Sequence, residues 1–68
     1  MPYINVQITK GATREQKAEI VKDFTETLVR VLGKNPQNTH IVIQEIEAED
    51  WGHAGGLVAD RRAATGTK

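Results

Sequence analysis

The stretch YINVQITKGATREQK, residues 3–17, holds a strand, a turn and a helix start in succession. Over residues 3–9, apolar residues alternate with polar ones, which predicts a strand with one buried face. Gly11 then breaks the alternation at a point where the chain must turn. Thr13 and Gln16 stand at the spacing of a capping box, in which each side chain bonds the backbone N–H of the other residue. The sequence therefore predicts a strand that leads directly into a helix.

The helix is expected to run from about residue 14 to about residue 32. Apolar residues recur within it at steps of three and four and form one stripe: Ala18, Val21, Phe24, Leu28 and Leu32, with Ile20 and Val31 beside them. Charged residues occupy the other side, so the stripe is predicted to pack into a core. Gly33 stands where a helix C-cap is common, and Pro36 cannot continue the helix.

Residues 39–46 form the second predicted strand, and the run Ile41-Val42-Ile43 within them suggests burial on both faces. A strand, a helix and a strand with short connections make a β-α-β unit, whose strands run parallel. The predicted fold class is therefore α/β (α+β), with a β-α-β protomer. The helix covers one face of the sheet, and the other face needs a cover that this chain does not contain. We expect another copy of the chain to supply it.

The C-terminal part is expected to be less regular. Residues 47–50 are acidic and predict a turn, and the glycine-rich residues 51–58 predict a short hairpin or an extended arm that packs on a neighbouring subunit. Residues 59–68 are small and polar and are expected to be frayed at their end. No internal repeat is visible, so residues 1–68 are expected to form a single domain.

Length and composition exclude several ways of stabilising the fold. A chain of 68 residues buries only about 60% of the surface that its unfolded form exposes, so a lone monomer is marginal. The chain has no cysteine for a disulfide, and His40 and His53 lack the spacing of a metal site. Self-association is the means of stabilisation that remains.

The charge balance and the short apolar runs argue against certain classes of binding partner. Nine Lys and Arg balance nine Asp and Glu, which argues against a nucleic-acid partner, although Arg61, Arg62 and Lys68 leave the end of the chain weakly basic. No apolar run is long enough to span a membrane. The N-terminus lacks the basic region followed by an apolar stretch that is typical of a secretory signal. We expect a cytoplasmic protein with neither a nucleic-acid nor a membrane partner.

The short motif in this sequence that could carry catalytic chemistry is its start, Met1-Pro2. A small second residue permits removal of the initiator methionine, which leaves Pro2 with a free secondary amine. Burial in an apolar pocket or a nearby cation would lower the pKa of that amine toward neutrality, where it can act as a base. The alternative is that Pro2 only precedes a strand, a position in which proline is tolerated.

The chain resembles the 4-oxalocrotonate tautomerase family over nearly its whole length. The segments that carry the resemblance are residues 2–8 (PYINVQI), residues 11–17 (GATREQK), residues 41–45 (IVIQE), Trp51-Gly52 and Gly55-Gly56. The resemblance implies a β-α-β protomer, usually assembled as a hexamer that is a trimer of dimers. It also implies that the amino-terminal proline acts as general base and then acid on small 2-oxo or 2-hydroxydienoic acids, with no cofactor and no metal.

The chain departs from the family at two positions that hold substrate carboxylates. The family's well-studied tautomerases carry an arginine directly after the glycine that corresponds to Gly11, and another at the start of the second strand. This chain has Ala12 and His40 there, and neither can form the two-pronged contact of a guanidinium. Arg61 and Arg62 could instead reach a neighbouring pocket, or they are a solvated tail.

Two further candidates have alternative explanations. Trp51 would dry the pocket and keep Pro2 neutral, or it would fill an oligomer interface. His40 would donate a hydrogen bond to a substrate oxygen, or it is an exposed histidine at a strand start. The candidate site is thus Pro2 as the catalytic residue, with His40, Trp51, Arg61 and Arg62 binding substrate.

The predicted function is an isomerase, a keto–enol tautomerase that uses Pro2 and needs no cofactor, of the kind associated with aromatic degradation. Dehalogenation or hydration and decarboxylation by the same proline are ranked below it. A non-catalytic oligomer that lost its substrate arginines is the other alternative, motivated by Ala12 and His40. A partner chain that supplies the missing arginines is a third.

Overall fold

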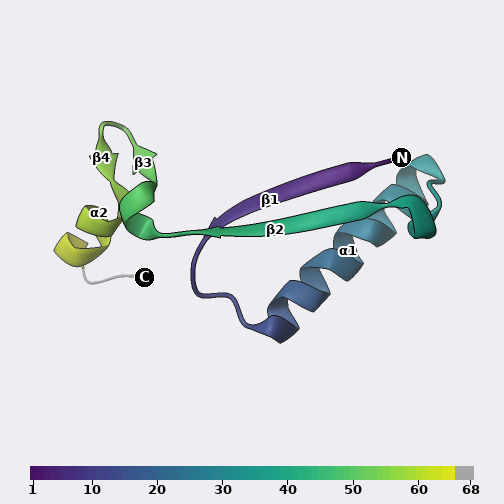
Figure 1. Cartoon of the computed structure of the whole chain (residues 1–68), viewed down its shortest axis with the longest axis horizontal. Coiled ribbons are helices and arrows are strands. Elements are labelled where there is room, and N and C mark those ends of the chain that lie inside the picture. The colour runs from purple at the N-terminus through teal and green to yellow at the C-terminus, as the bar shows by residue number, and fades with distance from the viewer. Residues whose placement is uncertain (66–68) are drawn as a thin grey trace.

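The computed structural model describes residues 1–65 of the chain. It has two long parallel strands, one long helix between them in sequence, and a small C-terminal unit (Figure 1). The elements are β1 (Tyr3–Thr9), α1 (Arg14–Leu32), the 3₁₀ turn η1 (Pro36–Asn38), β2 (His40–Ile46), the 3₁₀ turn η2 (Ala48–Asp50), β3 (Gly52–His53), β4 (Gly56–Leu57) and α2 (Val58–Thr65).

The β-α-β unit is confirmed. β1 and β2 pair in parallel, in a register that runs from Tyr3 opposite His40 to Thr9 opposite Ile46. β2 begins at His40 and not at Thr39, because the Thr39 backbone N–H bonds the Pro36 carbonyl and closes η1. Figure 1 shows β1 and β2 as one long ribbon pair, with α1 crossing one side of it.

Both predicted ends of α1 are confirmed. The Gln16 backbone N–H donates to Thr13 Oγ1 at 3.1 Å, and the Thr13 backbone N–H donates to Gln16 Oε1 at 2.9 Å, which completes the capping box. Gly33 adopts a φ of +64°, and its N–H bonds back into the last turn. These caps satisfy backbone groups that a helix end otherwise leaves without partners.

The two faces of the sheet have different surroundings. Ile4 on β1 lines an apolar hollow of about 270 Å³ together with Phe24 and Leu28 of α1, so its face of the sheet is the one turned toward the helix. The alternate positions point away from α1 and are all exposed. We call them the open face: Tyr3, Asn5, Gln7, His40, Val42 and Gln44.

The single chain leaves exposed two apolar surfaces that were expected to be buried. No described residue is buried, so the apolar stripe of α1 does not form a closed core, and Phe24 keeps 39% of its surface exposed. Val42 is 44% exposed, so β2 is covered on one face and not on both. The physical reason is that one helix can cover only one face of a two-stranded sheet.

The dimensions of the chain also show that it is less compact than a closed domain of its length. Its radius of gyration is 15.3 Å, against about 11 Å for a compact domain of this length. Its accessible surface is 5268 Å², against about 4,200 Å² for a folded monomer of this mass. The fold therefore has the geometry of one part of a larger assembly. Among residues 1–65, neither helix has the length and apolar character that crossing a membrane requires.

The C-terminal unit contains the predicted hairpin and one element that the sequence analysis missed. β3 and β4 pair antiparallel through a two-residue turn, in which Ala54 and Gly55 have positive φ values of +51° and +84°. Residues 58–65 form the helix α2, which the sequence analysis did not predict. The end of the chain, which was expected to be frayed, lies outside the described residues from residue 66 on. Alanines favour a helix there, and Asp60 complements the dipole in its first turn. Lys68 lies outside the described residues.

Candidate active site

Pro2 lies at one end of the sheet, immediately before β1. Its carbonyl oxygen accepts a hydrogen bond from the His40 backbone N–H at 3.0 Å. Pro2 is half-buried, whereas Met1 is 88% exposed. Met1 is thus accessible for removal, and its removal would leave the Pro2 amine at this end of the sheet.

His40 is the predicted site residue that the structure brings next to Pro2 within one chain. It opens β2 directly opposite Tyr3, and both side chains are exposed on the open face. An imidazole there can donate a hydrogen bond to a group bound near Pro2. His40 stays a prediction as a substrate-binding residue.

Trp51 lies at the opposite end of the molecule, after β2. Its backbone N–H donates to the Ala48 carbonyl at 3.4 Å, and its carbonyl accepts from the Val58 backbone N–H at 2.9 Å. Between this end and Pro2 stands β1, whose seven residues span roughly 20 Å. Trp51 therefore does not reach the Pro2 of its own chain, and a pocket that contains both residues needs a second chain (Figure 1).

Arg61 braces the hairpin against α2. Its Nη2 donates to the Ala54 carbonyl at 3.2 Å, and its Nη1 lies 3.5 Å from His53 Nδ1. The guanidinium also covers Gly56, where a Cβ atom would come within 3.2 Å of Nη2. Arg61 thus has a structural task inside its own chain, and a side chain at position 56 would require its guanidinium to shift by a few tenths of an ångström.

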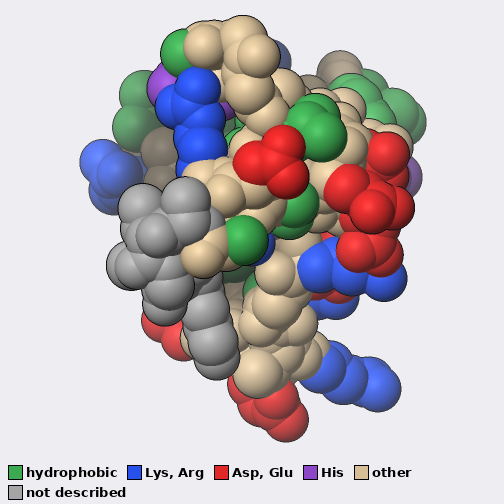
Figure 2. Space-filling view, turned by 90° about the vertical axis from the view of Figure 1, so that its left-hand side faces the viewer, with side chains coloured by type: hydrophobic (Ala, Val, Ile, Leu, Met, Phe, Trp, Pro, Cys, Tyr) green, Lys and Arg blue, Asp and Glu red, His purple; other side chains and the backbone are tan. Residues whose placement is uncertain are grey.

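Arg62 points the other way, toward the sheet. Its Nη2 donates to Thr9 Oγ1 at 2.7 Å, at the carboxyl end of β1, and the side chain is partly buried. The two neighbouring arginines therefore have different surroundings. Their adjacent positions in the sequence could not predict this difference. Figure 2 looks at this end of the molecule and shows acidic side chains gathered mainly on one flank, whereas basic side chains lie on both.

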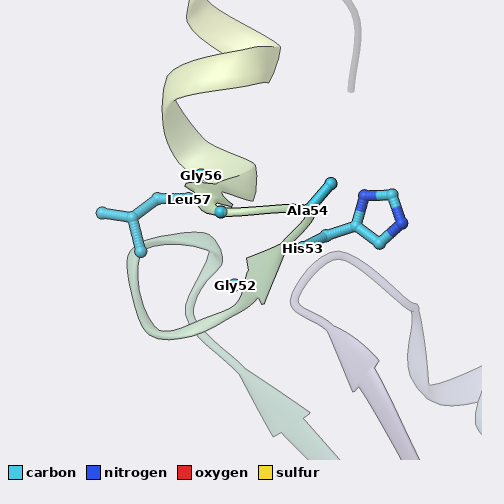
Figure 3. A pocket seen from close by; sticks show the side chains of 6 residues that line it. Gly52, His53, Ala54, Gly56 and Leu57 are labelled. Atoms are coloured by element: carbon cyan, nitrogen blue, oxygen red, sulfur yellow. The ribbon is translucent and has the colours of Figure 1, made fainter.

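The hairpin carries a shallow hollow of about 320 Å³ that is lined by residues 52–57. His53 and Leu57 project from it to opposite sides (Figure 3), as neighbouring positions of an antiparallel pair must. The hollow contains neither Pro2 nor Trp51, so we do not assign chemistry to it. Within residues 1–65, no three potential metal ligands converge.

Glu45, at the Trp51 end of the sheet, has a role that the sequence analysis missed. It points toward the helix side from β2, where its carboxylate accepts the Gly11 backbone N–H at 3.1 Å and pairs with Lys17 of α1. The Lys17 hydrogen bond, with help from the Gly11 N–H, holds the pKa of Glu45 below its usual value of 4.5. This carboxylate therefore fixes the loop that carries Ala12. The signal in the sequence was a charged residue at an inward position of an alternating strand.

A second ion pair closes the same end of the sheet. Lys10 Nζ lies 2.6 Å from Glu47 Oε1, and the Glu47 carboxylate raises the pKa of Lys10. With Lys17 bound to Glu45, two of the lysines at this end are already paired with carboxylates.

Acid is expected to weaken the fold through Glu45. Because the folded-state pKa of Glu45 lies below its unfolded value, its contribution to stability is present above pH 4.5 and is lost as the pH falls through the lowered value. The free energy of unfolding can be measured with urea at a series of pH values from about 5 to about 3, the range in which carboxyl groups titrate. It should fall less steeply over this range in Glu45→Gln than in the wild type. The matched change Glu49→Gln, on the exposed turn η2, should keep the wild-type slope. Identical slopes in the wild type and Glu45→Gln would contradict this role.

Comparison with known proteins agrees with this fold. A family model described as tautomerase enzyme matches residues 2–61. The chain belongs to the tautomerase family. Tautomerases are isomerases, so this tautomerase is assigned to that class of enzyme.

Individual relatives cover nearly the whole tautomerase chain. A probable tautomerase of Dickeya dadantii is 46% identical over 63 residues, which are 91% of this chain and 94% of that protein. A 4-oxalocrotonate tautomerase isozyme of Methylibium petroleiphilum superposes with a TM-score of 0.89 at 38% identity and covers 93% of this chain and 98% of its own. The DmpI structure of Helicobacter pylori gives 0.86 at 29% identity, with 91% and 97% covered. The resemblance to 4-oxalocrotonate tautomerases is thereby confirmed.

Proposed function

We propose that this tautomerase interconverts keto and enol forms of small 2-oxo or 2-hydroxydienoic acids, with Pro2 as general base and then acid. The observation that carries the proposal is the position of Pro2 in a chain of this family: it is half-buried at the end of the sheet, behind an accessible Met1. Removal of Met1 turns the Pro2 nitrogen from an amide, which has no basic lone pair, into a secondary amine.

The reaction needs one group that both takes and returns a proton. The Pro2 amine would remove the proton of the substrate's 2-hydroxyl group, while the electron pair moves along the conjugated system to carbon. The prolinium so formed would then protonate that carbon, which completes the ketone and restores the free amine. A base whose pKa lies near the working pH is the most effective for such a transfer.

A neighbouring subunit would complete the pocket. Trp51 lies too far from the Pro2 of its own chain, as the roughly 20 Å length of β1 shows, so the Trp51 of another copy would form the apolar wall. Such a wall excludes water and disfavours the charged amine, which lowers its pKa. His40 would donate a hydrogen bond to the substrate oxygen on which negative charge develops.

The assembly proposed is a homohexamer built as a trimer of dimers. It is supported by the exposed apolar surface of the single chain, with Val31 and Leu32 each 61% exposed, and by the open face of the sheet. In such an assembly, symmetry brings the same two ends of the molecule together at every site.

Turnover by processed protein tests the proposal. Intact mass should show that Met1 is absent, and the protein should then convert phenylenolpyruvate or 2-hydroxymuconate with a pH–rate profile governed by one group that titrates near neutrality. Protein that retains Met1 by the same mass measurement is the control and should be inactive. Equal turnover with and without Met1 would remove the proposed mechanism.

A further inference from the structure

We infer that Arg62, seated on Thr9, is the residue that binds the substrate carboxylate, and that it does so in the pocket around the Pro2 of a neighbouring subunit. The inference rests on the proposed function, because an oxo-acid substrate brings the carboxylate that needs a cation. It distinguishes Arg62 from Arg61 and gives the two residues different tasks.

The cations at the Trp51 end of the molecule differ in whether a carboxylate already neutralises them. Lys10 is paired with Glu47, and Lys17 is paired with Glu45. Arg62 is held by the neutral Thr9 hydroxyl, and no carboxylate among the described side chains lies within 4.0 Å of it. A partly buried guanidinium that keeps its full charge is the group best prepared to accept an anion.

The guanidinium geometry suits a carboxylate. Arg62 offers five N–H donors in a planar fork, and the Thr9 contact uses Nη2. A single hydroxyl partner fixes the position of the fork and leaves donors for two parallel bonds to a carboxylate. Arg61 has less freedom, because its Nη2 bonds the Ala54 carbonyl and its guanidinium lies over Gly56.

Arg62 also lies near the loop in which this chain has Ala12 where the resemblance implies an arginine. Thr9 is the last residue of β1, and the Gly11-Ala12 loop leaves the sheet just after it. Arg62 thus brings to this end of β1, from α2, a positive charge that is not paired with a carboxylate of the described residues, unlike Lys10 and Lys17. The family match spans residues 2–61 and ends one residue before Arg62.

Arg62 must act between subunits. It binds Thr9 at one end of β1, and Pro2 precedes the other end, so roughly 20 Å separate them in one chain. Trp51 lies at the same end as Arg62. A neighbouring copy that contributes Trp51 to a Pro2 pocket would therefore contribute Arg62 with it.

Binding of phenylpyruvate and of its methyl ester to the assembled protein tests the assignment without turnover. Arg62→Gln should weaken phenylpyruvate binding by about 10- to 100-fold, the loss expected for hydrogen bonds to a charged group, and should leave binding of the uncharged ester unchanged. The affinity of Arg62→Lys for phenylpyruvate should lie between those of the wild type and Arg62→Gln, because lysine keeps the charge and loses the planar fork of donors. Arg30→Gln, which removes an exposed arginine from α1, should bind both compounds as the wild type does.

The ester reports whether the pocket is intact. If Arg62→Gln bound phenylpyruvate as tightly as the wild type, or lost the acid and the ester equally, the carboxylate role would be overturned. If the wild type showed Arg62-dependent binding of phenylpyruvate but no turnover, the proposed function would fail and the binding role of Arg62 would stand.

Mixed assemblies test the contribution across subunits. Pro2→Ala and Arg62→Gln chains, unfolded, mixed in equal amounts and refolded together, should regain turnover of phenylenolpyruvate up to about one quarter of the wild-type value, because random mixing pairs an intact Pro2 with a neighbour's intact Arg62 at that fraction of sites. The same chains refolded separately and then combined should not. No gain in the mixed assembly would overturn the contribution between subunits, since every chain in the mixture lacks one of the two residues.

Discussion

Pro2→Ala is expected to lower kcat for phenylenolpyruvate by about 10²- to 10⁴-fold, the range that a positioned general base contributes. The variant keeps an amino-terminal amine after Met1 is removed. It loses the ring, which fixes the direction of the lone pair and makes the amine secondary. Steady-state kinetics on protein of confirmed intact mass gives the value, and KM should change far less than kcat because the ring does not hold the carboxylate.

The chain supplies a matched control in its second proline. Pro36 opens η1 at the same end of the molecule, but its nitrogen is an amide inside the chain and has no basic lone pair. Pro36→Ala should keep the wild-type kcat, and its effect should be confined to the stability of the turn. Equal kcat values for Pro2→Ala and the wild type would show that another group moves the proton.

Val42→Asp is expected to abolish the assembly and, with it, the fold. Val42 lies on the open face and is 44% exposed in the single chain, in which none of the described side chains is buried. In the proposed assembly another copy covers this face, and a carboxylate there would cost several kcal/mol in each subunit, because the charge loses its hydration without gaining a partner. Separated chains cannot bury enough apolar surface to stay folded.

Two measurements follow the loss. Sedimentation of the wild type should give a mass of about 45 kDa if six chains of 7.5 kDa assemble, whereas Val42→Asp should sediment as single chains. Far-UV circular dichroism should show that the signal of α1 is lost in the same variant. Gln37→Asp, which places the same charge on the exposed η1 turn, should leave mass and spectrum unchanged. A folded, monomeric Val42→Asp would contradict the dependence of the fold on assembly.

The two ends of α1 illustrate what could be predicted from sequence. The Thr13 and Gln16 pair and the glycine at position 33 define caps that depend only on residues within one or two turns. The alternation of β1 is local in the same sense. Helix α2 shows the limit of such reasoning, because its alanines and charges carry no apolar stripe, and short polar segments give a weak helical signal.

Some features of the candidate site could likewise be predicted from the sequence, and others could not. Pro2 could be singled out from the chain start and from the resemblance, and the parallel register placed His40 next to it. The different tasks of Arg61 and Arg62 could not be predicted, because adjacent residues on a helix point about 100° apart and the sequence does not say which one faces the sheet. Nor did the sequence reveal that Glu45 would reach back to the Gly11 loop.

The residue order alone determined the two strands, the long helix and its caps, and an amino-terminal proline behind a removable methionine, because all of these follow from local periodicity and neighbouring side chains. Only the tertiary structure decided that Trp51 and Arg62 lie at the far end of β1 from Pro2, and how much of the apolar stripe of α1 stays exposed in one chain. Those facts depend on the length of a strand in space and on what a single helix can cover. Neither of these is a property of nearest neighbours in the chain.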